Sequence, residues 1–172
     1  MEKFGKRFKG KVAIVTPSTQ GIGFSIAERL GLEGASLVIS SRKQKYGKLD
    51  VIVSNTAVNP TVDAILETKE PALDKLWDIN AKAAILLFQA LAAEMAPSTR
   101  VNCVSPGFVP THFANFITGN ANLRKELEAK TLLNRLGTTQ DMAAATAYLA
   151  SDDAAYVTGE TLVVAGGMHF RL

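Results

Sequence analysis

Five short runs of apolar, mostly β-branched residues are spaced along the chain, and helical patterns lie between them. The runs are Val12–Thr16, Leu37–Ser40, Val51–Ser54, Arg100–Val104 and Thr161–Ala165. They are nearly continuous in apolar character, which is typical of parallel strands that helices cover on both faces. Strands that alternate with helices in this way predict a layered α/β fold.

Three helical patterns connect these strands. The first has a stripe of isoleucine and leucine residues four apart from Ile22 to Leu30, and Gly34 lies where a C-terminal cap is expected. The second pattern runs from about Leu73 to Met95 and the third from about Asp141 to Ala150. The helices therefore have the length and placement of crossover connections between parallel strands.

Composition sets the broad class of protein. A chain of 172 residues, 47% apolar and 20% charged, suits one globular domain with a hydrophobic core. Its net charge of +3 reflects basic clusters near the start and from Arg42 to Lys48. Such clusters attract phosphorylated ligands, but a solvated surface of mixed sign explains them as well. We expect no nucleic-acid binding, since no reading motif accompanies the charge, and no membrane segment, since no apolar run approaches about 20 residues.

Other reactive side chains give weak signals. Cys103 is the only cysteine, so an internal disulfide is excluded, and its apolar surroundings predict a buried, inert thiol. Histidine is a common acid or base near neutral pH, but His112 is predicted to be a surface residue, and Asp152-Asp153 is predicted to be a solvated helix end. Because no His, Cys and Asp residues cluster with ligand spacing, we expect no metal site.

A glycine-containing loop joins the first strand to the first helix, with the sequence Thr16-Pro17-Ser18-Thr19-Gln20-Gly21-Ile22-Gly23. Glycines in such a loop let the backbone approach a ligand closely, and the N–H groups at the helix start favour a pyrophosphate. A turn of this kind before an amphipathic helix also occurs in many α/β proteins without a ligand. The loop alone leaves both interpretations open.

Further segments follow this loop in a fixed order. After the second strand comes Ser40-Ser41-Arg42-Lys43, where an arginine suits a ribose 2′-phosphate and an acidic residue would suit a free 2′-hydroxyl. This pattern favours NADP(H) over NAD(H). The remaining segments are Ser54-Asn55-Thr56-Ala57, Trp77-Asp78-Ile79-Asn80, Asn102-Cys103-Val104-Ser105-Pro106-Gly107 and the stretch from Thr158 to Gly167.

Taken together, these segments resemble the short-chain dehydrogenase/reductase family, and most closely its branch of plant tropinone-reductase-like proteins and peroxisomal NADP-dependent carbonyl and retinol reductases. The resemblance extends from Gly10 to Gly167. It implies a Rossmann-like doubly wound parallel sheet, here truncated, with residues 1–172 forming a single NADP(H)-binding domain. It also implies interconversion of a carbonyl and an alcohol on a small molecule, and commonly a homo-oligomer.

The resemblance assigns roles to single residues. Asn80 matches the family's active-site asparagine, which supports a water-linked proton relay. The residues that match cofactor contacts are Ser18, Gln20, Gly21, Ile22 and Gly23 in the diphosphate loop, Arg42 and Lys43 at the 2′-phosphate, Asn55 and Ala57 beside the adenine ribose, and Pro106, Gly107, Val109 and Thr111 along the nicotinamide. Pro17 replaces the usual first glycine of the loop and removes an N–H donor, so we expect it to weaken phosphate binding.

No part of this chain matches the segment that contains the family's catalytic serine, tyrosine and lysine. In the family the lysine lies four residues after the tyrosine and lowers its pKa, since an unassisted tyrosine with a pKa of about 10 is a poor acid near neutral pH. Four residues after Tyr46, Tyr148 and Tyr156 stand Asp50, Asp152 and Glu160. We therefore expect activity to be strongly impaired.

At two places, motifs that are well separated in the family lie close together in this chain. This spacing predicts internal deletions. At Gln44–Lys45 a helix, an edge strand and most of another helix are absent, and at Gln89–Ala90 a strand and the tyrosine-lysine helix are absent. Skipped exons or a faulty gene model would produce such junctions. We expect the remaining strands to form one sheet, in the order second, first, third, fourth and fifth. An uncovered apolar face is expected beside the short connection from Ser40 to Val51.

Two functions remain open on this evidence. One is an NADP(H)-dependent oxidoreductase of impaired activity, and the other is a non-catalytic nucleotide-binding or dimerising remnant. The deletions are expected to weaken any homo-oligomer, and the substrate cannot be predicted because the absent segment forms part of the pocket. The final Phe170-Arg171-Leu172 resembles a peroxisomal address only in its last two positions, so location stays open between cytoplasm and peroxisome.

Overall fold

The computed structural model describes residues 5–16, 18–38, 47–57, 68–114 and 120–168. The chain divides into two compact units. The first unit comprises Met1–Asn55, Val104–Tyr156 and Leu162–Leu172, and the second comprises Thr56–Cys103 and Val157–Thr161. The first unit contains the glycine-containing loop, and the second contains Asn80.

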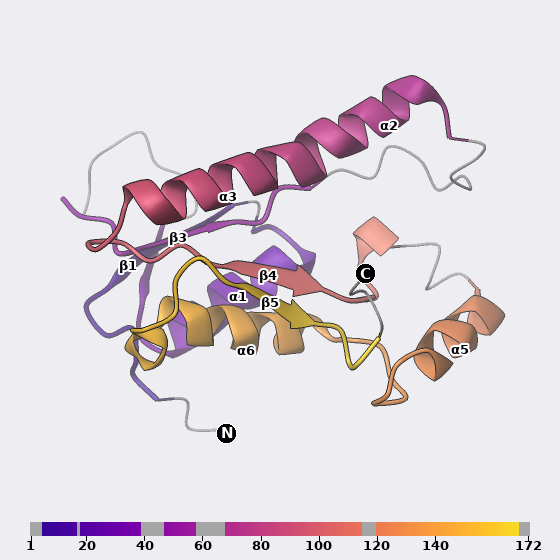
Figure 1. The fold of residues 1–172 in the computed structure, drawn as a ribbon. Helices are drawn as coiled ribbons and strands as arrows, with labels where there is room; N and C mark the ends of the chain where they lie inside the picture. The colour runs from indigo at the N-terminus through magenta and orange to yellow at the C-terminus, as the bar shows by residue number, and fades with distance from the viewer. Residues whose placement is uncertain (1–4, 17, 39–46, 58–67, 115–119, 169–172) are drawn as a thin grey trace. The chain divides into compact units, whose positions relative to one another are not determined.

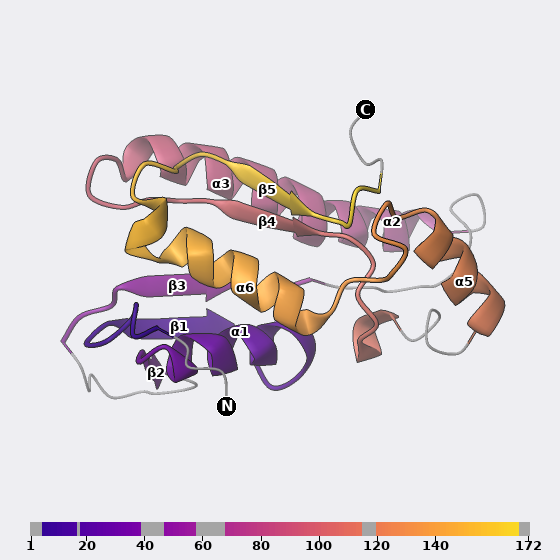
Figure 2. The same ribbon diagram turned by 90° about the horizontal axis from the view of Figure 1, so that it is seen from below.

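A three-stranded parallel sheet forms the centre of the first unit. Its strands are β1 (Val12–Thr16), β2 (Ser36–Val38) and β3 (Val51–Ser54), in the spatial order β2-β1-β3 that Figure 2 shows. The predicted bounds of β1 and β3 are confirmed. Strand β2 begins one residue before the predicted Leu37, and Ser40 lies outside the described residues.

Two helices pack on one face of this sheet. Helices α1 (Gly21–Leu32) and α6 (Thr139–Ala150) lie side by side (Figure 2), and their apolar residues meet those of β1 and β3 in the main core. The buried members of this core are Phe8, Ala13, Val15, Ile26, Leu30, Val51, Ala143 and Ala147. Gly34 follows α1 at a φ of +101°, which confirms the predicted glycine at the helix end.

The apolar side chains beside the short connection into β3 are exposed. Ile52 is 69% exposed and Leu49 is 43% exposed. This agrees with the uncovered apolar face that the short connection predicts, because a parallel sheet is normally covered on both faces.

Strands β4 (Cys103–Pro106) and β5 (Thr161–Val164) form a separate two-stranded sheet. The Cys103 N–H donates to the Glu160 carbonyl at 2.8 Å, and the Gly107 N–H donates to the Val164 carbonyl at 2.9 Å. The difference in residue number is the same for both bonds, so the two strands run parallel. The predicted single five-stranded sheet is therefore wrong. Paired strands must lie about 4.8 Å apart, and in the described part of the chain no strand joins β3 to β4.

Strand β4 begins later than the predicted Arg100. The Asn102 side chain donates to the Val157 carbonyl at 2.8 Å and accepts from the Glu160 N–H at 3.2 Å, and the Val101 N–H donates to the Thr158 hydroxyl at 3.1 Å. Side chains thus take the place of part of the backbone ladder before Cys103, which sequence periodicity does not reveal.

The second unit is dominated by one continuous helical run (Figure 1). It comprises α2 (Glu70–Leu76), a π-helical stretch from Trp77 to Lys82, and α3 (Ala83–Glu94). The helix predicted from Leu73 to Met95 is confirmed, with its start three residues earlier.

Among the described residues of the first unit there are three smaller elements besides the sheets and main helices. They are a 3-10 turn at His112–Ala114, helix α5 (Ala121–Ala129) and a 3-10 turn at Asp152–Ala154. Helix α5 was not predicted. Its buried Leu127 packs in a small apolar cluster with Ala114 and Leu136.

A buried carboxylate joins the segment before β1 to the end of α1. The Glu33 side chain is 1% exposed, and its oxygens accept hydrogen bonds from the guanidinium groups of Arg7 and Arg29. Burial raises the pKa of Glu33, but the two guanidinium groups outweigh burial and hold the pKa below its ordinary value. Arg7 also pairs with Asp153 at 3.1 Å, and the Phe8 N–H donates to the Glu33 carbonyl at 3.0 Å.

We expect Glu33→Gln to lower the free energy of unfolding by about 3 kcal/mol, because it leaves two guanidinium groups without their buried partner. Urea unfolding measures this change. The matched control is Asp153→Asn, which removes a 61% exposed carboxylate from the same network and should cost less than about 1 kcal/mol. Equal effects of the two variants would contradict the account.

The pH dependence of the free energy of unfolding tests the same interaction of Glu33 with the two arginines. A carboxylate whose folded pKa is depressed stabilises the fold above its unfolded pKa, about 4.3 for glutamate, and this stability is lost as the pH falls through the folded value. The parent should therefore lose stability below about pH 4.3 more steeply than Glu33→Gln does. Parallel pH profiles would exclude this role for Glu33.

Candidate functional site

The loop after β1 leads directly into α1. Gly21 is the first residue of the helix and has a φ of +62°, a left-handed conformation that glycine adopts without strain. Gly23 is buried, Ser18 and Ile22 are half-buried, and Gln20 is exposed. The predicted diphosphate residues are therefore contiguous at the carboxyl end of β1, while Pro17 lies outside the described residues.

The start of α1 differs from the starts of the other helices in this unit. Gln20 makes no side-chain capping hydrogen bond and the first turn contains no acidic residue. By contrast, the Asn120 side chain caps α5 and the Thr138 side chain caps α6. Backbone N–H groups and the positive end of the helix dipole are suited to an anion, so this donor set fits the pyrophosphate of a dinucleotide.

Thr111 lies against this helix start. A Cβ placed on Gly21 would be 3.6 Å from the Thr111 methyl carbon. Val109, two residues earlier, is buried, and the Gly137 N–H donates to the Phe108 carbonyl at 3.0 Å. The structure thus brings Thr111, which was predicted beside the nicotinamide, to the glycine of the diphosphate loop.

Pro106 and Gly107 lie where β4 ends against β5. A Cβ on Gly107 would lie 2.8 Å from the Cα of Ala165, which is closer than real Cβ atoms approach backbone. Pro106 is exposed and Gly107 half-buried. Glycine at position 107 is therefore needed for the close approach of the two chain segments.

Asn55 lies at the end of β3, next to the end of β1. Its N–H donates to the Thr16 carbonyl at 2.5 Å. At the opposite end of the same strands, the Asp50 carboxylate accepts from the Val12 N–H at 2.7 Å. This backbone hydrogen bond, together with the Lys48 ammonium, lowers the pKa of Asp50. Sequence reasoning missed Asp50, which holds β3 in register with β1 and so positions Asn55.

Two predicted site residues belong to the second unit. Asn80 is half-buried within the π-helical stretch that begins at Trp77, and Ala57 is exposed. The structure places Thr111 beside Gly21 and Asn55 beside the end of β1, whereas Asn80 and Ala57 belong to the other unit. Arg42 and Lys43 lie outside the described residues.

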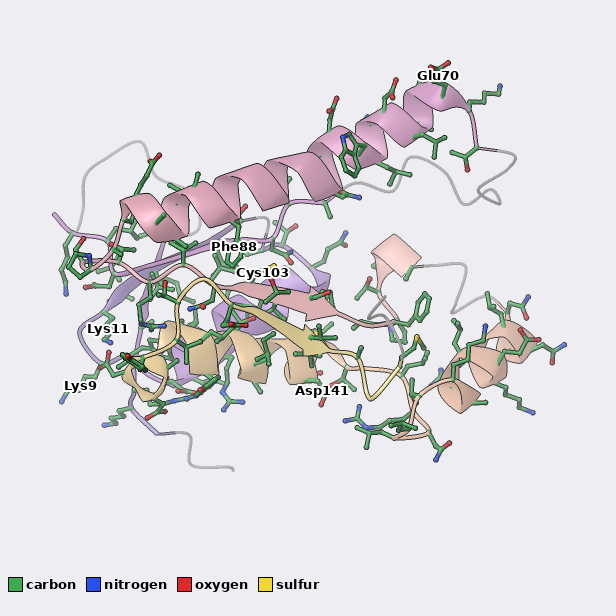
Figure 3. All side chains as sticks on the ribbon, in the orientation of Figure 1. Lys9, Lys11, Glu70, Phe88, Cys103 and Asp141 are labelled. Carbon is green, nitrogen blue, oxygen red and sulfur yellow. The ribbon has the colours of Figure 1, made fainter. Side chains whose placement is uncertain are left out.

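The side chains of Cys103 and Asp141, which Figure 3 labels, serve the fold and not the candidate site. Cys103 is half-buried, not fully buried as predicted, and burial raises the pKa of its thiol, which makes the reactive thiolate scarcer. Hydrogen bonds from Arg135 hold the pKa of Asp141 far below its usual range, while Asp141 and Thr138 form a capping box. The Thr-x-x-Asp spacing was a signal for this box that the sequence analysis did not use.

Two kinds of feature are absent from the described residues. No helix there is long and apolar enough to cross a membrane. No group of three or more His, Cys, Asp or Glu residues within the described ranges could hold a metal ion.

Parallel strands, crossover helices and a glycine turn at the carboxyl end of β1 define a Rossmann-type fold. Solved structures share it: the ligand-free aldohexose dehydrogenase of Thermoplasma acidophilum superimposes with a TM-score of 0.80 at 22% identity, covering 98% of this chain and 97% of that one. A putative 2-deoxy-d-gluconate 3-dehydrogenase of Agrobacterium tumefaciens with bound NADP gives a TM-score of 0.76 at 21% identity, covering 99% of this chain and 100% of that one.

Sequence comparisons extend the likeness beyond the fold. A family model described as enoyl-(acyl carrier protein) reductase matches residues 82–169. Tropinone reductase-like 3 of Erythroxylum coca is 49% identical, covering 98% of this chain and 96% of that protein. Short-chain dehydrogenase/reductase SDRA of Arabidopsis thaliana is 48% identical, covering 99% of each. The chain belongs to the short-chain dehydrogenase/reductase family, an oxidoreductase family whose members bind a nicotinamide cofactor and act on small molecules.

The same alignments show how this chain differs in length. The match to the Erythroxylum coca protein runs over 249 positions, which is 77 more than the 172 residues of this chain. Since the match covers nearly all of both proteins, at least 77 positions fall opposite gaps inside this chain. This agrees with the prediction of internal deletions.

We expect Gly107→Ala to lower the free energy of unfolding by about 1–3 kcal/mol, because the new methyl group meets the Ala165 backbone. Gly5→Ala is the matched control, since its Cβ meets nothing closer than the Arg7 Cγ at 3.9 Å and should change stability by less than about 0.5 kcal/mol. Urea unfolding of both variants checks the packing of β4 against β5. Similar values for the two would show that the approach at Gly107 is not tight.

Proposed function

We propose that this chain binds NADP(H) at the loop between β1 and α1, and that its carbonyl–alcohol oxidoreductase activity is strongly impaired. The support for binding is the left-handed Gly21, the uncapped start of α1 and the contact of Thr111 with that start. These features suit a pyrophosphate with the nicotinamide half extending toward Thr111.

Arg42 and Lys43 support NADP(H) over NAD(H). A guanidinium forms charge-assisted hydrogen bonds with a phosphate, whereas an acidic residue at this place would bind the ribose hydroxyl groups of NAD. The Agrobacterium tumefaciens structure with bound NADP shows that the fold accepts this cofactor in another protein.

The proposal of impaired activity rests on the proton-transfer step of the reaction. A bound nicotinamide supplies or accepts hydride, but the substrate oxygen must also exchange a proton with a protein group. No tyrosine of this chain has a lysine four residues later. In the described residues, Tyr156 is fully exposed and Asp152, four residues after Tyr148, pairs with Lys11 at 2.7 Å. Asn80 alone cannot act as the acid, because a neutral amide does not titrate near neutral pH.

The absence of a tyrosine with a lysine four residues later also favours a second candidate function, that of a non-catalytic nucleotide-binding module. The two candidates differ only in turnover. Both require the cofactor site, so a test of binding precedes a test of catalysis.

We expect the chain to bind NADPH about tenfold or more tightly than NADH, as measured by titrating nucleotide fluorescence. Arg42→Ala should abolish the difference, since a hydrogen bond to a charged group contributes about 1.5–3 kcal/mol and about 1.4 kcal/mol corresponds to tenfold in affinity. Lys45→Ala, a nearby basic residue outside the proposed site, is the matched control and should keep the preference. Equal affinity for the two nucleotides in the parent chain would overturn the assignment of NADP(H).

A further inference from the structure

Strand β3 lies at one edge of the three-stranded sheet (Figure 2), and no described strand pairs with its outer side. The Asn55 N–H donates to the Thr16 carbonyl of β1 at 2.5 Å. Because backbone groups alternate in direction along a strand, those of Val51 and Val53 also face β1, and those of Ile52 and Ser54 face outward. An edge of this kind is a template for another strand.

The strand residues at this edge include none of the residue types that natural proteins use to block strand addition. Such edges usually carry lysine, proline or a bulge. Val51–Ser54 contains neither residue, and its pairing with Ala13–Thr16 is regular over four residues. Its side chains are apolar and β-branched at the first three positions, which favours pairing.

The sheet face away from α1 and α6 adds an apolar surface to this edge. Ala13 and Val51 contribute to the core on the helix side, so their strand neighbours Ile14 and Ile52 lie on the opposite face. The register aligns Val38, Ile14 and Ile52 in one row across the three strands, and Ile52 is 69% exposed. The row ends at the outer edge of β3.

The length comparison indicates what occupies this edge in longer relatives. At least 77 positions of the Erythroxylum coca protein fall opposite internal gaps in this chain. The sheet of this chain is interrupted between β3 and β4. One cause accounts for both observations: the missing positions include the strand that pairs with β3.

We propose that the outer edge of β3 is a docking site for an extended strand of a longer chain of this family, namely the strand that this chain lacks. Backbone hydrogen bonds to Ile52 and Ser54 provide the binding energy, and the Ile52 side chain packs against alternate side chains of the incoming strand. The docked strand completes the sheet in trans. The proposal rests on family membership and the open edge, and not on cofactor binding.

The test uses the full chain and a synthetic peptide with the sequence of the Erythroxylum coca protein between the positions that align with Gln89 and Ala90. Hydrogen exchange at the Ile52 and Ser54 amides should slow by about tenfold or more when the peptide is added, and labelled peptide should bind saturably. A peptide of scrambled sequence is the control. Unchanged exchange at both amides would overturn the proposal.

Variants locate the binding at the edge. Ile52→Lys should weaken peptide binding by about tenfold or more, because it places a charge in the row that receives the strand. Leu132→Lys, which changes a 74% exposed leucine outside β3, should bind as the parent does. A concentration-dependent dimer of the chain alone, with the Ile52 and Ser54 amides already protected, would assign the edge to a second copy and contradict the proposal. The exchange measurement uses the unmodified chain, so it decides even if Ile52→Lys fails to fold.

Discussion

The packing of α1 against β1 and α6 is the interaction on which the first unit depends. Ile26 and Leu30 are buried between the sheet and α6, and each such side chain contributes about 1.5–3 kcal/mol when fully buried. Ala143 and Ala147 on α6 are small enough to let the two helices approach closely. This packing fixes the axis of α1, and the axis in turn sets where the uncapped helix start and Gly21 lie.

Charged groups secure the other end of the same helix. Glu33 immediately follows α1 and is held by Arg7 and Arg29, while Arg7 also reaches Asp153 beyond α6. The network therefore links the segment before β1, the end of α1 and the turn after α6. A buried carboxylate is costly without such partners, which explains why two guanidinium groups converge on the Glu33 side chain.

Local patterns predicted the elements that depend on local chemistry. The apolar runs of β1 and β3, the stripe of α1 and the glycine at its end were predictable because periodicity and backbone freedom decide them. Helix α5 was missed because it is mostly polar, although Asn120 was available as a capping signal. The late start of β4 and the Arg7–Glu33 ion pair depend on partners 26 to 58 residues away. Such contacts leave no periodic trace in one sequence, whereas the family motifs singled out both Gly21 and Thr111, which the structure places side by side.

The central claim is that this chain retains the cofactor-binding part of its family's machinery and lacks the proton-transfer part. The most direct measurement follows NADPH absorbance after the purified chain, saturated with NADPH, is mixed with a panel of ketones and aldehydes. Our account predicts that NADPH binds and that its oxidation does not exceed the rate without protein. Carbonyl-dependent NADPH oxidation in proportion to the amount of protein would contradict it.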